Sequence, residues 1–126
     1  MEVVYMLYRV QKLEDIFEYE GKGHFTCKAT RLHTCTDMEG GQLTMGITHF
    51  FPHGGAFVRE TQFEMIYYAL KGGITIITAD TEDGEQTRHY LKEGESIRFM
   101  PGACRGIDND TEETVQMMVV MIVPQK

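Results

Sequence analysis

The chain lacks tryptophan and contains only three prolines and three cysteines among its 126 residues. Cys27, Cys35 and Cys104 include no closely spaced pair, so the sequence indicates neither a disulfide framework nor a cysteine-based zinc site. Free thiols of this kind are typical of a reducing compartment. We therefore expect a cytoplasmic protein.

Long apolar runs and clusters of positive charge are also missing. No stretch approaches the ~18 apolar residues of a membrane span, and Glu2 stands where a secretory signal would need positive charge. The formal net charge is −7, and the lysines and arginines are scattered. Because a phosphate backbone is bound by concentrated basic residues, we expect neither a nucleic acid nor a membrane as partner.

What the sequence does contain is a succession of short β-prone segments separated by glycine and aspartate turns, with almost no helical periodicity. Residues 42–51 show the period of two most clearly, with Leu43 and Met45 on one face and Thr44 and Gly46 on the other. Strands are expected at residues 25–35, 42–51, 62–70, 73–79, 89–91, 96–100, 104–107 and 114–123. This pattern predicts an all-β protein with an antiparallel barrel or jelly roll.

Two connections between these strands are predicted from turn-forming residues. The run from Pro52 to Gly55 is expected to be a loop, after which the chain returns to strand structure near Phe57. The run Lys71-Gly72-Gly73 is expected to close a tight hairpin between residues 62–70 and 73–79.

The N-terminal region has a less regular pattern. Residues 3–10 place apolar side chains at successive positions, which favours a strand covered on both faces or lent to a neighbouring subunit, so we expect a homodimer. Residues 13–19 could form a single helical turn or a bend into another strand. The length suits one domain over residues 1–126, with N-terminal strands in residues 1–41 and a barrel core in residues 42–124.

The segment GESIRFMPGACRGIDN, which begins at Gly94, resembles the second motif of the cupin family, Gly-x5-Pro-x-Gly-x2-His-x3-Asn. Gly94, Gly102 and Asn109 match this motif. Met100 stands in the proline position and Arg105 in the position of the metal-binding histidine. The resemblance implies a single-domain cupin, that is, a double-stranded β-helix or jelly-roll barrel.

The segment QFEMIYYALKGG resembles in spacing the first cupin motif, Gly-x5-His-x-His-x(3 or 4)-Glu-x6-Gly. Counting back from the last motif glycine places Met65 in the glutamate position, with Arg59 and Thr61 in the two histidine positions. The longer spacing would place Val58 and Glu60 there instead. With either spacing, none of the four metal-ligand positions holds its usual residue.

Among cupins, the stretch GITHFFPHGGAFVRETQFEMIYYALKGGITI resembles the ethanolamine-utilisation cupins of the EutQ type, which are also short of metal-binding histidines. This resemblance implies a bacterial protein associated with ethanolamine breakdown and its microcompartment, with microcompartment proteins as partners. It also implies acetate kinase-type activity, the transfer of a phosphoryl group between acetyl phosphate and ADP. The sequence contains no glycine-rich phosphate loop and no paired acidic residues that would indicate a magnesium site.

In a cupin barrel, the preferred spacing would direct Arg59, Thr61, Met65 and Arg105 into the interior, with Tyr67 on the same face as Met65. Guanidinium groups stay protonated and do not ligate cations, so we expect no metal cofactor at these positions. Two arginines in a small barrel would instead form a positive pocket, to which Thr61 and Tyr67 add hydroxyl donors. The prediction is a small anionic ligand such as a carboxylate or a phosphate.

Two other arrangements of these residues stay open. Arg59 could lie in solvent while Arg105 pairs with a surface acid such as Asp108. Alternatively, a slip of the strand register by one residue would turn Glu64 inward, where burial would raise its pKa and make it a general base or a metal ligand.

Other hypotheses rest on residues outside the two motifs. His49 and His53, together with Glu64, could bind a divalent transition metal, which would make the protein a metal-dependent cupin enzyme acting on a small organic acid or a sugar. The missing motif ligands also favour a non-catalytic microcompartment assembly module. Cys104 has no histidine close in sequence to act as its base, so a nucleophilic role is disfavoured. The remaining histidines do not cluster and are expected on the surface: His24, His33 and His89.

Overall fold

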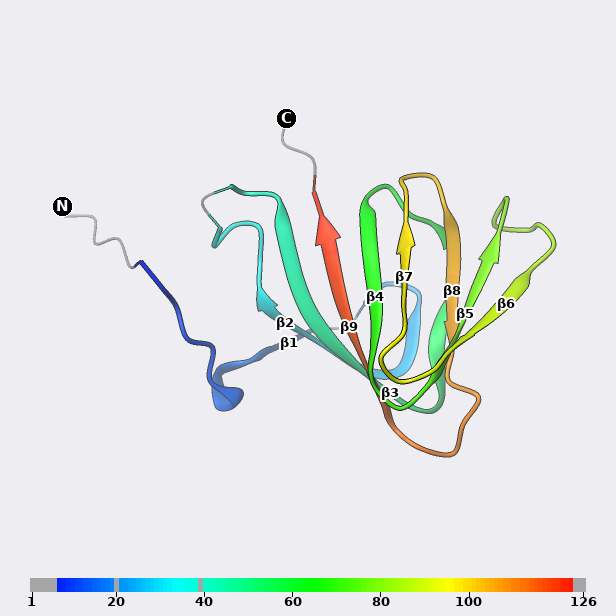
Figure 1. Cartoon of the computed structure of the whole chain (residues 1–126), viewed down its shortest axis with the longest axis horizontal. Coiled ribbons are helices and arrows are strands. Elements are labelled where there is room, and N and C mark those ends of the chain that lie inside the picture. Colours follow the sequence, from blue (N-terminus) through cyan, green and yellow to red (C-terminus); the bar gives the residue numbers. More distant parts are fainter. Residues whose placement is uncertain (1–6, 20, 39, 124–126) are drawn as a thin grey trace.

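The computed structural model describes residues 7–19, 21–38 and 40–123. Figure 1 shows that these residues form β-strands wrapped into a barrel, with an extended N-terminal segment that leads away from it. No α-helix occurs in the described ranges, which contain only one short 3-10 turn. The elements are η1 Leu13–Asp15, β1 Phe17–Tyr19, β2 His24–His33, β3 Leu43–Glu60, β4 Glu64–Lys71, β5 Ile74–Ala79, β6 Thr87–Leu91, β7 Ser96–Phe99, β8 Cys104–Asp108 and β9 Val115–Ile122.

All strand pairings in the described residues are antiparallel, and they connect distant parts of the sequence. The strand order is β6-β5-β8-β3-β9-β4-β7, while β2 also pairs with β3, and β1 pairs with β2. This curled sheet forms a nearly closed barrel (Figure 1). The predicted all-β barrel is confirmed.

Strand β3 is the longest element and crosses from one wall of the barrel to the other. Its residues 43–50 pair with β9, and its residues 55–60 pair with β8. The loop predicted at Pro52–Gly55 is therefore wrong, because these residues bend within the strand. The glycines serve close packing there: a Cβ on Gly54 would lie 2.1 Å from the Thr26 carbonyl oxygen, and one on Gly55 would lie 2.0 Å from the Ile107 carbonyl oxygen.

The hairpin predicted between β4 and β5 is also wrong. Strand β4 pairs with β7 and β9, whereas β5 pairs with β6 and β8. The Lys71-Gly72-Gly73 run instead passes the chain from one wall to the next. The carboxylate of Glu93 accepts a 2.9 Å hydrogen bond from the Gly72 backbone N–H at this corner.

The register of β4 follows the predicted alternation. Met65, Tyr67 and Ala69 are buried, whereas Glu64 and Tyr68 are exposed. The alternative of a register slipped by one residue is therefore wrong. The inward residues join the core, whose fully buried large side chains are Tyr67, Phe50, Ile74, Ile76, Met117, Val115 and Asn109.

The described part of the N-terminal segment lies apart from the barrel (Figure 1). The strand expected at residues 3–10 falls partly outside the described residues, and residues 7–10 are not in a strand. Leu7 is 100% exposed, and an ion pair of 3.2 Å joins Arg9 to Asp37. Residues 13–19 combine both expected conformations, a 3-10 turn followed by a short strand. In the described ranges, no helix has the length and apolar character needed to cross a membrane.

Asn109 holds together the bend of β3 and the loop between β8 and β9. The two N–H groups of its Nδ2 are shared among the carbonyl oxygens of Phe50, Phe51 and Glu113, at N–O distances of 3.0, 3.1 and 2.8 Å. Its Oδ1 accepts a 2.6 Å hydrogen bond from the hydroxyl of Thr111. Since the side chain is fully buried, no solvent could replace these bonds.

We predict that Asn109→Ala lowers the free energy of unfolding by about 2–4 kcal/mol, because the buried carbonyl of Phe50, two partly buried carbonyls and the backbone N–H of Thr111 lose their partner at once. Urea denaturation followed by circular dichroism would measure the loss. The matched control is Gln62→Ala, which removes an exposed amide of similar size and should change stability by less than about 0.5 kcal/mol. Equal stabilities of the two variants would contradict the role assigned to Asn109.

Candidate functional site

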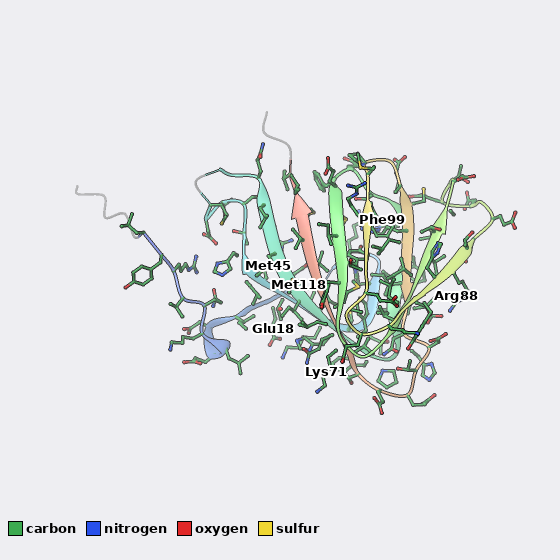
Figure 2. All side chains as sticks on the ribbon, viewed as in Figure 1. Glu18, Met45, Lys71, Arg88, Phe99 and Met118 are labelled. Carbon is green, nitrogen blue, oxygen red and sulfur yellow. The ribbon has the colours of Figure 1, made fainter. Side chains whose placement is uncertain are left out.

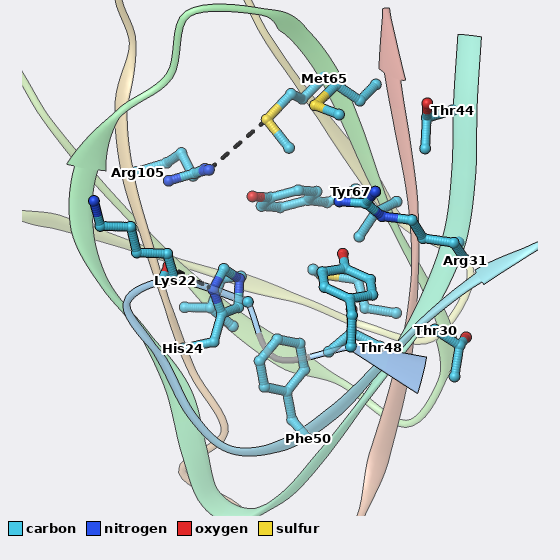
Figure 3. A pocket seen from close by; sticks show the side chains of 17 residues that line it. Lys22, His24, Thr30, Arg31, Thr44, Thr48, Phe50, Met65, Tyr67 and Arg105 are labelled. Carbon is cyan, nitrogen blue, oxygen red and sulfur yellow. Dashed lines mark hydrogen bonds between the residues drawn. The ribbon is translucent and has the colours of Figure 1, made fainter. Parts of the chain in front are cut away.

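A cavity of about 210 Å³ opens inside the barrel. Strand β3 contributes the face that carries Thr44, Gly46, Thr48 and Phe50, one of the two faces expected from its alternation. Strand β9 closes another side with apolar side chains, namely Met117, Val119 and Met121. The result is a largely apolar chamber to which a few polar groups are added (Figure 3).

The charged residues that line this cavity are all basic. Arg105 enters from β8, and Lys22 and Arg31 come from the turn before β2 and from β2 itself. The guanidinium of Arg31 stacks 4.3 Å above the ring of Tyr19, which also lines the cavity. No aspartate or glutamate occurs among the lining residues in the described part of the chain. In a protein with a formal net charge of −7, the cavity is thus a local positive site.

Arg105 is the basic residue placed deepest in this arrangement, and its hydrogen bonding is incomplete. One terminal nitrogen donates to the Arg59 carbonyl oxygen at 3.4 Å, and the other lies 3.8 Å from the sulfur of Met65. Its Nε is buried without any hydrogen-bond partner. Both contacts are long for a charged donor, so the guanidinium retains donor capacity that the described residues do not use.

Tyr67 brings a hydroxyl group into the same chamber from β4. Its ring packs edge-on against Phe99 with centroids 5.2 Å apart, and its hydroxyl points toward Arg105 (Figure 3). Burial raises the pKa of the Tyr67 phenol, while the charge of Arg105 and a hydrogen bond from it act in the opposite direction. The group is therefore a neutral hydrogen-bond donor at neutral pH.

The other predicted ligand-binding residues lie in different positions. Met65 lines the cavity. Thr61 is buried but does not line the cavity, and its hydroxyl donates a 3.2 Å hydrogen bond to the sulfur of Met65. Arg59 is exposed at the end of β3, and its side chain lies against the turn at Gly23. Of the predicted set, Met65, Tyr67 and Arg105 line the cavity, while Thr61 and Arg59 do not.

The alternative pairing of Arg105 with Asp108 does not occur. Asp108 forms an ion pair of 2.6 Å with Arg88 instead, on the outside of the barrel. The other part of that alternative, an exposed Arg59, agrees with the structure. Arg59 nevertheless lies near His24 and adds to the local positive charge.

His24 is a cavity-lining residue that sequence analysis placed on the surface. Its Nδ1 lies 3.1 Å from the carbonyl oxygen of Lys22. Burial lowers the pKa of His24; the hydrogen bond to Lys22 opposes this shift, and the charges of Arg105 and Arg59 add to it. The one sequence signal for this position is its place directly after the Gly21-Lys22-Gly23 turn, which folds the chain back over the barrel.

The shifted metal site is not assembled. His49 lies on the outer face of β3 and pairs with Gln116 of β9. Glu64 of β4 pairs with Ile122, which lies six residues after Gln116 on β9. That separation corresponds to roughly 20 Å along a strand. His53 pairs with Glu112 at 3.4 Å. Across residues 7–19, 21–38 and 40–123, no group of three histidine, cysteine or acidic side chains could hold a metal ion.

Cys104 is buried, and desolvation is the main cause that raises the pKa of its thiol. Because the thiolate is the reactive form, this agrees with the expectation that Cys104 is not a nucleophile.

Comparisons with known proteins identify the fold in which this cavity lies. No family model matches the sequence, and no curated protein matches it. Among solved structures, the polyketide cyclase RemF from Streptomyces resistomycificus superposes with a TM-score of 0.76 at 19% identity, covering 94% of this chain and 81% of that one. An RmlC-like cupin from Shewanella frigidimarina gives a TM-score of 0.71 at 13% identity, covering 94% of each chain. This chain has the cupin fold.

Another cupin neighbour is a predicted oxalate decarboxylase from Thermotoga maritima, with a TM-score of 0.71 at 14% identity, covering 92% of this chain and all of that one. At such low identity, the likeness shows the fold alone. Two of these neighbours are named for different activities, so the function of this chain has to be argued from the residues of its own cavity.

We predict that Arg105→Gln raises the pKa of His24, because the substitution removes a nearby positive charge that opposes protonation of the imidazole. A proton NMR titration of the histidine Cε1–H signals would measure the change. Arg88→Gln, on the outer surface, is the control and should leave the His24 titration unaltered. An unchanged His24 pKa in Arg105→Gln would show that the two groups are not coupled.

Proposed function

We propose that this cupin binds a small organic anion inside its barrel, with the guanidinium of Arg105 as the principal contact. The observation that supports the proposal most directly is the buried Nε of Arg105, which lacks a hydrogen-bond partner. A buried charged donor left unpaired is costly, whereas a carboxylate or phosphate could accept two parallel hydrogen bonds from the guanidinium. No described acidic side chain lies within ion-pair distance of Arg105 to take that place.

The size and walls of the cavity favour a small carboxylate over inorganic phosphate. Its volume of about 210 Å³ is below the roughly 300–1,000 Å³ of sites for drug-sized ligands. Phe50, Met117 and Val119 would surround the part of the ligand that does not touch Arg105. Since apolar walls reward the burial of carbon atoms and not of phosphate oxygens, an acid with a short carbon chain is the better match.

The proposal requires no metal. The positions that carry histidine and glutamate in the cupin motifs hold Arg59, Thr61, Met65 and Arg105 here, and a guanidinium repels a divalent cation. A metal-dependent enzyme acting on a small organic acid or a sugar is the competing proposal. Stoichiometric transition metal in protein purified without a chelator would favour that competitor.

A narrower form of the proposal is an acetate kinase-type, EutQ-like protein of an ethanolamine-utilisation microcompartment. Acetate and acetyl phosphate are anions small enough for the cavity. The described lining residues include no carboxylate to hold Mg²⁺, and a cavity of about 210 Å³ leaves little room for a nucleotide beside the acid. In this form, ADP would bind outside the barrel. A non-catalytic microcompartment module would use the same cavity for binding alone.

We also propose that the protein is a homodimer. Two observations support a second copy as the partner. Apolar residues of the N-terminal segment are exposed, and the outer face of β3, β9 and β4 is largely apolar, with His49, Gln116 and Glu64 toward its edges. Met45 and Met118 lie on this outer face (Figure 2), and Ile66 and Tyr68 continue it, each 38% exposed. Covering such a face with an equivalent one would remove it from water on both copies.

For anion binding, we predict that isothermal titration calorimetry detects a short-chain carboxylate such as butyrate in the wild type. Arg105→Gln should weaken this binding at least 10-fold, because the charged, bidentate contact is lost. Arg59→Gln should weaken it less than about 3-fold, and Arg88→Gln should have no effect. Tight binding to Arg105→Gln would contradict the proposed function.

For the dimer, we predict that sedimentation equilibrium gives twice the chain mass. The double variant Ile66→Asp/Met118→Asp should give a single-chain mass, since each carboxylate would have to be buried unpaired in the interface. Glu85→Lys, on the exposed loop after β5, should remain dimeric. A monomeric wild-type protein would refute the proposed assembly.

A further inference from the structure

The imidazole of His24 is held in a single tautomer. A backbone carbonyl oxygen can only accept, so the 3.1 Å contact with Lys22 means that Nδ1 carries the proton. The neutral ring therefore has its lone pair on Nε2, which forms no hydrogen bond with any described residue. A Cβ on Gly21 would lie 2.8 Å from Nδ1, so only glycine at that position leaves the ring where it is.

Three groups of different chemistry meet at this cavity from separate elements. They are the neutral imidazole of His24 from the turn before β2, the guanidinium of Arg105 from β8 and the phenol of Tyr67 from β4 (Figure 3). Burial, and in addition the charges of Arg105 and Arg59, disfavour the imidazolium form of His24. The chamber thus combines an available base with two donors that could stabilise a developing oxyanion.

We propose that this cavity catalyses the keto–enol interconversion of a small 2-oxo acid, with His24 as the base. This inference rests on the proposed anion binding, because Arg105 must hold the carboxylate. A simple carboxylic acid would not suffice, since its α-hydrogens are far too weakly acidic for an imidazole. A ketone next to the carboxylate lowers that barrier and gives Tyr67 an oxygen to which it can donate.

The step is a proton transfer and needs no oxidant, reductant or further reactant. The bond between C3 and its hydrogen breaks, and that proton binds to Nε2 of His24. The electron pair forms the C2–C3 double bond, and the carbonyl π electrons move to the oxygen as an enolate. Tyr67 and Arg105 donate to that oxygen and to the carboxylate. The imidazolium then returns its proton to the oxygen, giving the enol, or to C3, giving the ketone.

Proton NMR of 2-oxobutyrate in deuterium oxide tests the inference, because each reversal of the step exchanges a C3 hydrogen for deuterium. The full chain, treated with a chelator to remove stray metal, should speed the loss of the C3 signal at least 100-fold over buffer. His24→Gln keeps a donor for the Lys22 carbonyl but has no base, so exchange should fall to the buffer rate. Tyr67→Phe should slow exchange about 10-fold, and His89→Gln, on β6, should match the wild type.

The pH dependence of exchange separates a base from a merely structural histidine. The charged or titratable groups around His24 are Arg105, Arg59, Lys22, Arg31, the thiol of Cys27 and the phenols of Tyr67 and Tyr19. Because burial, with the positive groups adding to it, lowers the pKa of His24 below its ordinary value of 6.5, exchange should persist below pH 6.5 and be lost only as His24 becomes protonated. The same profile in Arg59→Gln, which keeps the carboxylate contact of Arg105, should move to higher pH.

Binding of 2-oxobutyrate, measured by calorimetry on the same samples, distinguishes the two proposals. Binding with exchange that depends on His24 supports both. Binding with exchange at the buffer rate, or with equal exchange in the wild type and His24→Gln, overturns the catalytic inference and leaves anion binding intact. If neither 2-oxobutyrate nor butyrate binds, both proposals are overturned.

Discussion

The polar chemistry of the barrel interior depends on a single positive charge, which needs hydrogen-bond acceptors. The guanidinium of Arg105 lies among apolar walls, and its contacts are a backbone carbonyl, a thioether sulfur and the hydroxyl of Tyr67. Water or a ligand must supply the remaining acceptors, because charge cannot be removed from a guanidinium at any ordinary pH. The charge of Arg105 faces the hydroxyl of Tyr67, and it adds to burial, the main cause, in lowering the pKa of His24.

The architecture keeps that charge in place with connections that have little to do with ligand chemistry. Strand β3 spans both walls, and Asn109 fixes its bend from within the core. Arg105 lies four residues before Asn109 on the same strand and loop, so the structural anchor and the charged group are positioned together. The second cupin motif therefore keeps its structural asparagine, Asn109, while the side chain of Arg105 occupies the position of the metal-binding histidine.

The sequence predicted the barrel, and it predicted which side of β4 faces inward, because a period of two in Met65, Tyr67 and Ala69 is a local property that burial reinforces. It did not predict the continuity of β3. Pro52, Gly54 and Gly55 have the composition of a loop, and only the close approach of other strands shows why glycine is required there. His24 was missed for a related reason: its neighbours in space, Arg105 and Arg59, are far away in the sequence, so no spacing rule could connect them.

The turn at residues 21–23 has a consequence for how such a protein can change. It carries His24 into the cavity and supports the side chain of Arg59, yet none of its residues belongs to the hydrophobic core. The proposed base is thus carried by a segment outside the core, whereas Arg105 and Tyr67 belong to strands of the barrel itself. Substitutions in this short segment could give the same barrel new chemistry while the fold beneath it is preserved.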